Sequence, residues 1–157
     1  MKLDMESEYK RAIGKALVLV GHSDRTAYEL TNRLIQNGFS EEIVQQVTEF
    51  LIDERYIDDN RYAQYYVVCY QGKRSVARIR RELLTKGIDK SIVDDVLCEC
   101  DDAEAFDKAL QKQLRKRNVR DISQADFATR KKIAEALYRQ GFSTTLFQSY
   151  LTDRDIR

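Results

Sequence analysis

Apolar residues recur along this chain with the three- and four-residue spacing of amphipathic helices, and the same arrangement occurs three times. Each occurrence is centred on a glycine, at Gly38, Gly87 and Gly141. Apolar side chains stand eight and four positions before each glycine, and again five and six positions after it. Positions eight and four before the glycine lie on one face of a helix. The pattern therefore predicts a unit of helical structure repeated three times.

Polar residues around each glycine predict where the helices begin and end. Twelve positions before the glycine stands a hydroxyl residue that suits a helix N-cap, and in the first copy Glu29 follows at capping-box spacing. The glycine fits the left-handed position just past a helix end. The predicted caps of the first helix are Thr26, Ser75 and Thr129, and those of the second are Ser40, Asp89 and Ser143.

A further amphipathic stretch precedes each pair, so every copy is predicted to hold three helices. The copies run from residues 6–55, 58–100 and 101–151, with short links between them. The chain has no proline, and no segment alternates strictly between apolar and polar residues. We predict an all-α fold of three tandem three-helix repeats, arranged as an elongated, curved helical array.

Composition indicates the cellular compartment in which the protein is expected and the state of its cysteines. The N-terminus is polar and no long apolar run is present, so neither a signal peptide nor a membrane span is expected. The cysteines Cys69, Cys98 and Cys100 are odd in number, and their spacing together with a single histidine does not suit a zinc site. Free thiols in the cytoplasm are expected, with no metal and no cofactor.

Charge is distributed unevenly although the net charge is only +1. Residues 1–60 carry 7 Lys and Arg against 12 Asp and Glu, whereas residues 61–157 carry 20 against 14. Basic clusters on one side favour an anionic partner, but charged residues also simply coat exposed helices. Both interpretations stay open. The residues predicted to form a basic face are Lys73, Arg74, Arg78, Arg81, Lys86, Arg115, Lys116, Arg130 and Lys131.

Catalysis is not expected, because the chain has one histidine, no phosphate loop and no metal-binding motif. Reading of DNA sequence by the first copy is disfavoured, since its second helix is acidic where a recognition helix is basic. The tyrosines Tyr62, Tyr65, Tyr66 and Tyr70 could stack on bases, but their spacing fits a buried helix face better.

The combination of these motifs resembles the RecX family, bacterial regulators of the RecA recombinase. The resemblance covers about residues 10–151. Four segments carry it: Thr26 to Gly38 with Glu29, Leu30 and Leu34; Arg55-Tyr56-Ile57-Asp58-Asp59 followed by Arg61-Tyr62-Ala63; Gly72 to Ile88 with Ser75, Arg78, Ile79, Glu82 and Leu83; and Lys131 to Ser143, ending in Gln140-Gly141-Phe142-Ser143.

The resemblance implies a monomeric, non-enzymatic protein that binds RecA and lodges in the helical groove of the RecA–DNA filament. It would thereby inhibit strand exchange, ATP hydrolysis and co-protease activity, in DNA repair, recombination and the SOS response. Some family members also bind single- or double-stranded DNA, so a DNA-binding module acting without RecA is the alternative. The motif residues Tyr56, Asp58, Asp59 and Arg61, like the three glycines, are expected to serve mainly structure.

Overall fold

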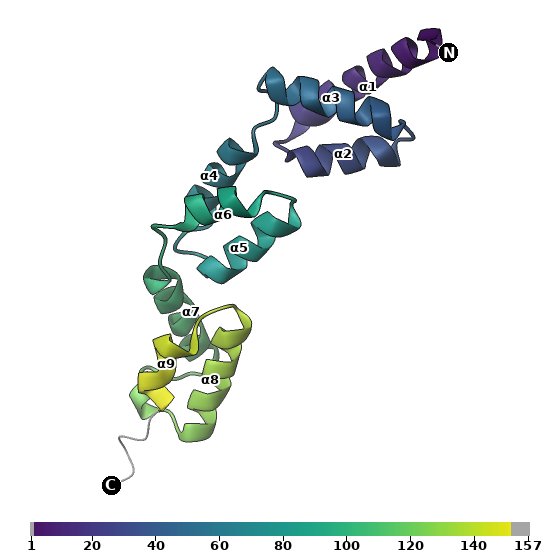
Figure 1. Ribbon diagram of the computed structural model, residues 1–157. Coiled ribbons are helices and arrows are strands. Elements are labelled where there is room, and N and C mark those ends of the chain that lie inside the picture. Colours follow the sequence, from purple (N-terminus) through teal and green to yellow (C-terminus); the bar gives the residue numbers. More distant parts are fainter. Residues whose placement is uncertain (1, 152–157) are drawn as a thin grey trace. The chain divides into compact units, whose positions relative to one another are not determined.

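The computed structural model describes residues 2–151, without the side chains of residues 149–151, and in this range the chain is helical with no strand (Figure 1). Nine α-helices and one 3-10 turn fall within the described range: α1 Lys2–His22, α2 Ala27–Gln36, α3 Glu41–Asp53, α4 Asp59–Tyr70, α5 Val76–Thr85, α6 Lys90–Leu97, α7 Ala103–Lys116, η1 Ile122–Gln124, α8 Phe127–Arg139 and α9 Thr144–Leu151. The predicted all-α class of tandem three-helix repeats is confirmed.

The described chain forms two compact units whose boundary falls inside the second repeat. The first unit contains residues up to 66 together with 82–96, and the second contains 67–81 together with residues from 97 onward. Helices α4 and α5 thus contribute residues to both units. The division into repeats at 6–55, 58–100 and 101–151 stays a prediction.

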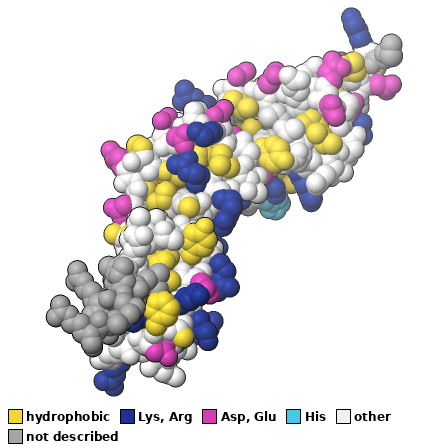
Figure 2. Space-filling view, turned by 60° about the horizontal axis from the view of Figure 1, so that its bottom comes forward, with side chains coloured by type: hydrophobic (Ala, Val, Ile, Leu, Met, Phe, Trp, Pro, Cys, Tyr) yellow, Lys and Arg dark blue, Asp and Glu magenta, His cyan; other side chains and the backbone are white. Residues whose placement is uncertain are grey.

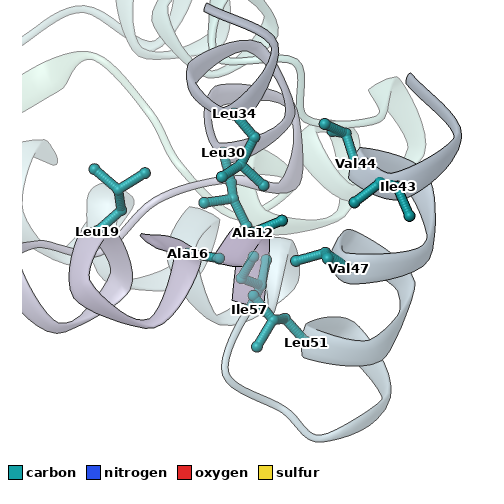
Figure 3. Close-up of a cluster of buried hydrophobic side chains, with 10 residues drawn as sticks. All are labelled: Ala12, Ala16, Leu19, Leu30, Leu34, Ile43, Val44, Val47, Leu51 and Ile57. Carbon is teal, nitrogen blue, oxygen red and sulfur yellow. The ribbon is translucent and has the colours of Figure 1, made fainter. Parts of the chain in front are cut away.

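The core of the first unit is built by α1, α2 and α3, which pack against one another in all three pairings. Small side chains of α1 allow this close approach, because Ala12 and Ala16 are fully buried. Branched side chains of α2 and α3 fill the space around them (Figure 3). Ile57 comes from the loop after α3 and points into the same cluster, so it anchors that loop to the core.

The core of the second unit lies between α7, α8 and α9, and combines aliphatic side chains with three phenylalanines. The ring of Phe106 meets Phe142 edge-on at 5.6 Å and stacks on Phe147 at 6.4 Å between centroids. Ile122 of η1 closes this cluster. This turn lies between α7 and α8, and Asp121 initiates it by accepting hydrogen bonds from Ser123.

The three predicted corners are confirmed, and all three are Schellman motifs. After α2, the amide of Gly38 donates to the carbonyl of Ile35, and the amide of Phe39 donates to that of Leu34. The same pair of bonds follows α5 and α8. The glycines have φ values of 89°, 77° and 96°, a backbone region in which a Cβ is strained.

Two of the predicted first-helix caps are confirmed. The hydroxyl of Thr26 accepts a hydrogen bond from the amide of Glu29 at 3.2 Å, and the carboxylate of Glu29 accepts one from the amide of Thr26, which completes the capping box. The hydroxyl of Ser75 accepts from the amide of Arg78 at 3.2 Å. Helices α2 and α5 therefore begin where the spacing predicts.

The third predicted cap is wrong. Helix α8 begins at Phe127, so Thr129 lies inside its first turn, and Asp126 is the N-cap. The carboxylate of Asp126 accepts from the amide of Thr129 at 2.8 Å. An aspartate is a better N-cap than a threonine, which explains why the helix starts one turn earlier than the pattern predicts.

The second-helix caps are confirmed at Asp89 and Ser143, which accept hydrogen bonds from the amides of Ser91 and Thr145. Ser40 is the N-cap residue of α3 as predicted, but its hydroxyl makes no capping bond. The amide of Ser40 instead donates to the carboxylate of Glu8 in α1 at 2.7 Å, so α1 holds this helix start in place.

Candidate partner-binding surface

Consecutive repeats are joined at two junctions that hold the candidate residues in place. Each junction contains an equivalent pair of hydrogen bonds. In the first junction, the hydroxyl of Thr26 donates to the carbonyl of Lys86 at 2.6 Å, and the amide of Ala27 donates to the carboxylate of Asp59 at 2.9 Å. The threonine hydroxyl is therefore both the cap of α2 and a donor to the corner of the next repeat. Both bonds lie within the first unit.

The second junction repeats this arrangement within the second unit. The hydroxyl of Ser75 donates to the carbonyl of Gln140 at 2.6 Å, and the amide of Val76 donates to the carboxylate of Asp102 at 2.7 Å. In each junction a cap residue and an acidic residue at the start of the next repeat satisfy two polar groups of the backbone. The sequence spacing identified the caps but not this second role.

Lys86 belongs to the first unit and pairs with residues of that unit. Its amine pairs with the carboxylate of Glu29 at 3.2 Å and lies 5.9 Å from the ring centroids of both Tyr62 and Tyr66. Partial burial lowers the pKa of Lys86, but the hydrogen bond and charge of Glu29 outweigh burial and raise the pKa above its ordinary value. This cation already has a partner within the chain.

The other eight predicted basic residues all belong to the second unit. Arg78 and Arg81 stand three positions apart on α5, so they share one face of that helix. Lys73 is exposed in the turn before α5, and the guanidinium of Arg74 lies 3.7 Å from the ring centroid of Tyr70. The start of the second unit thus concentrates positive charge within about two helical turns.

Helices α7 and α8 carry the remaining four residues. Arg115 and Lys116 are exposed in the last turn of α7, where the helix dipole favours positive charge. On α8, Arg130 is half-buried and Lys131 is exposed beside a hollow of about 550 Å³ that Tyr138 also lines. On the face seen in Figure 2, Lys and Arg side chains are frequent over the C-terminal part of the chain, while Asp and Glu predominate near the N-terminus.

The Tyr-Ile-Asp-Asp motif divides into structural and exposed members. Asp58 caps α4 by accepting a hydrogen bond from the amide of Arg61 at 3.0 Å, and Asp59 belongs to the first junction. In contrast, Tyr56 is 52% exposed, and the side chain of Arg61 is also exposed. The two aspartates serve the backbone, whereas the tyrosine and the arginine face solvent.

The tyrosines of α4 do not all lie on the predicted buried face. Tyr62 and Tyr66 are half-buried and stacked, with ring centroids 6.2 Å apart. Tyr65 is 65% exposed, so the prediction is wrong for this residue. With 3.6 residues per turn, the buried positions Ala63 and Val67 define the inner face, and position 65 points away from it. The apolar pattern could not distinguish the two faces because α4 is apolar on both.

No cluster of three or more His, Cys, Asp or Glu side chains that could hold a metal occurs among the described residues. Within the same range, no helix is both long and apolar enough to cross a membrane. The three cysteines are free thiols. Burial, followed by the neighbouring negative charges, raises the pKa of the Cys100 thiol, which makes it a weaker nucleophile at neutral pH.

Comparison with known proteins places this arrangement in a family. Residues 12–51 match the family model described as the first three-helix domain of RecX, and residues 58–97 match the second three-helix domain. A protein named regulatory protein RecX from Mycobacterium sp. (strain KMS) is 29% identical over 160 residues, which cover 95% of this chain and 86% of the relative. A protein of the same name from Clostridium acetobutylicum is 34% identical over 92 residues, or 59% of this chain and 43% of the relative.

Two crystal structures share the fold. One, of regulatory protein RecX, superposes with a TM-score of 0.80 at 24% identity over 95% of this chain and 74% of its own. The other, of RecX from Lactobacillus salivarius, gives a TM-score of 0.76 at 22% identity over 97% of this chain and 99% of its own. The two domain matches, which together span about half of the chain, show that it belongs to the RecX family of regulatory proteins.

Proposed function

We propose that this protein binds RecA and its nucleoprotein filament in the helical groove, and that it inhibits the recombinase, ATPase and co-protease activities of the filament. Membership of the RecX regulatory family carries the proposal. We further propose that the protein acts in the cytoplasm, without catalysis, metal or cofactor.

The distribution of charge supports a contact through the second unit. Eight of the nine predicted basic residues belong to that unit, while the ninth, Lys86, pairs with Glu29. A filament wrapped on DNA presents acidic protein surface and phosphate, and both attract guanidinium and ammonium groups. Residues 1–60 carry an excess of acidic groups and are a poor match for phosphate.

Reversing charge on α5 tests this proposal directly. The double variant Arg78→Glu with Arg81→Glu places two acidic groups on one helix face and should weaken inhibition of RecA by about tenfold or more. The measurement is the ATPase activity of RecA on single-stranded DNA at increasing concentrations of this protein. Circular dichroism checks that the variant keeps its helical content.

The matched control is Arg11→Glu with Lys15→Glu, which makes the same charge change at two exposed positions of α1 in the acidic part of the chain. This control should inhibit about as well as the parent. If both double variants inhibit like the parent, the basic face of the second unit is not the contact, and if the parent itself does not inhibit RecA, the proposed function is wrong.

The basic residues also support the alternative function, a DNA-binding module acting without RecA. Salt distinguishes the two, because affinity for bare DNA falls steeply with salt in proportion to the phosphates neutralised. Binding to bare single-stranded DNA as tight as binding to the filament, with that steep salt dependence, would favour the alternative.

A further inference from the structure

Arg55 occupies a backbone conformation that an arginine rarely adopts. It has a φ of 60° and stands at the left-handed position of a Schellman motif that closes α3. The amide of Arg55 donates to the carbonyl of Ile52 at 3.0 Å, and the amide of Tyr56 donates to that of Leu51 at 2.9 Å. The equivalent position after α2, α5 and α8 is glycine. An arginine here is strained by its Cβ, so glycine would suit the fold better.

The loop that carries Arg55 is held firmly on both sides. Ile57 is 2% exposed and belongs to the core of the first unit, and its amide donates to the carbonyl of Leu51 at 3.2 Å. Asp58 caps the following helix, and Asp59 holds the amide of Ala27. Residues 55 and 56 therefore project from a fixed backbone, and a rigid loop loses little entropy when a partner binds it.

Exposed aromatic and basic side chains surround this loop. Tyr56 and Tyr65 are 52% and 65% exposed, and both line a hollow of about 130 Å³ together with Arg61, Arg25 and the carboxylates of Asp24 and Asp58. On the other side of the loop, Arg55 and the partly exposed Ile52 line a second hollow of about 570 Å³. We call Arg55, Tyr56, Arg61 and Tyr65 the loop surface. Tyrosine and arginine are the residue types most enriched at the energetic centre of protein interfaces.

The charges at the loop surface favour an acidic protein partner. Among the described residues, no ion pair or side-chain hydrogen bond engages the guanidinium groups of Arg55 and Arg61. The neighbouring carboxylates of Asp58 and Asp59 accept from backbone amides instead. Both guanidinium groups are thus available to a carboxylate from outside.

We propose that the loop surface is a second contact with the partner protein, one that receives an acidic side chain adjacent to an apolar or aromatic one. Arg55 and Arg61 pair with the carboxylate, and the apolar side chain enters beside Tyr56 and Tyr65. The partner is the protein surface of the RecA filament, so this inference rests on the proposed function. The strained backbone at Arg55 is retained because its side chain binds the partner.

The variant Arg55→Gly tests this idea because stability and binding should move in opposite directions. Glycine relieves the left-handed strain, so the melting temperature should rise by about 1–4 °C. Removal of the guanidinium should weaken binding to immobilised RecA–single-stranded DNA filaments by about tenfold or more. Tyr56→Ala should weaken binding by a similar factor with an unchanged melting temperature, because this side chain is exposed.

Two control variants distinguish the loss of the Arg55 side chain from the loss of any exposed arginine and from the change to glycine at a left-handed position. Arg33→Ala removes an exposed arginine of α2 in the same unit, and Asn118→Gly makes the equivalent backbone change after α7, where Asn118 has a φ of 55°. Both should bind like the parent. If the parent does not bind the filament, this inference and the proposed function fail together.

If the parent binds but Arg55→Gly and Tyr56→Ala bind equally well, this inference alone is wrong. A melting temperature of Arg55→Gly below that of the parent also overturns it, since the arginine would then stabilise the fold. Equal weakening of binding to bare DNA would overturn the assignment of a protein partner.

Discussion

The two junctions share their backbone hydrogen bonds but differ in the side chains around them. In both, a hydroxyl cap donates to the carbonyl that precedes a glycine, and a carboxylate accepts from the amide after the cap. At the first junction the opposite charges of Glu29 and Lys86 form an ion pair. The equivalent positions at the second junction are Arg78 and Gln140, which carry no opposite charges.

This difference shows that the same backbone hydrogen bonds can join repeats whose surrounding side chains differ. The hydrogen bonds that join the repeats involve only the backbone, a hydroxyl and a carboxylate, so the surrounding side chains are left to vary. At the first junction the opposite charges of Glu29 and Lys86 pair with each other. The second places an arginine where the first has a glutamate, and this arginine belongs to the predicted basic face.

Among substitutions at the two junctions, alanine at the glycine corners should lower the free energy of unfolding the most. A Cβ at Gly87 would overlap the side chain of Tyr28, and one at Gly141 would lie 2.6 Å from the hydroxyl of Ser75. At Gly38 the space is open. Gly87→Ala should therefore lower the free energy of unfolding by about 3 kcal/mol, and Gly38→Ala by only about 1 kcal/mol from its left-handed backbone. Urea denaturation measures both.

Gly141→Ala should fall between these two variants, because its nearest obstacle is a single hydroxyl that the second junction holds in place. Equal losses at Gly38 and Gly87 would mean that the corner conformation alone matters. The close approach of consecutive repeats at the first junction would then contribute nothing to the requirement for glycine.

The hydroxyls of Thr26 and Ser75 each cap a helix and also bond to the next repeat. Removing either one should lower the free energy of unfolding by an intermediate amount. Thr26→Val keeps the shape of a fully buried side chain but removes both the cap of α2 and the bond to the carbonyl of Lys86. The expected loss is about 2 kcal/mol, and Ser75→Ala at the second junction should lose a similar amount. Thr129→Val should lose less than about 1 kcal/mol, since Asp126 caps α8.

Thr26→Ser retains a hydroxyl and serves as the control, so most of the stability should remain. Thermal and urea unfolding of all four variants provide the test. A loss at Thr129 as large as that at Thr26 would contradict the assignment of a second role to the hydroxyls of the two junctions.

Asp59 is the acidic residue of the first junction. Its substitution by asparagine should change the free energy of unfolding the least, and the change should depend on pH. Burial raises the pKa of Asp59 above its ordinary value, the charges of Asp58 and Glu29 add to this shift, and the amide of Ala27 opposes it. Because ionisation is less favourable in the folded state, the free energy of unfolding should fall as pH rises from about 4 through the raised pKa. Asp59→Asn keeps the acceptor oxygen and should remove this fall.

At pH 7 the Asp59→Asn variant should be as stable as the parent or more stable by less than about 1 kcal/mol, since solvent screens a half-exposed group. Below about pH 4 the two should be equal. Asp59→Ala removes the acceptor and should be less stable than both. A lower stability of Asp59→Asn than of the parent at pH 7 would show that the negative charge itself stabilises the junction.

Local features of the fold were predictable from the sequence, because each depends on residues close together in the chain. The Schellman corners and the capping box of Thr26 and Glu29 follow from spacings of three to six residues. Thr129 was misassigned for the same reason: its spacing is correct, but the stronger cap Asp126 lies one turn earlier.

The long-range features could not be predicted. The hydroxyl of Thr26 finds its acceptor 60 residues later, and the amine of Lys86 finds Glu29 57 residues earlier. Lys86 therefore appeared to be one more surface cation. The conformation of Arg55 was also hidden, since a left-handed arginine has no compositional signal of the kind that glycine provides.

The earlier start of α8 separates two tasks that one residue performs at each junction. In the first two repeats the residue that caps the helix also donates its hydroxyl proton to a carbonyl of the repeat that follows. At the start of α8 the cap is the carboxylate of Asp126, which accepts hydrogen bonds but cannot donate one when ionised. The hydroxyl at the equivalent spacing belongs to Thr129, inside the first turn of the helix. Capping and hydroxyl donation therefore belong to one residue at the two junctions and to two different residues in α8.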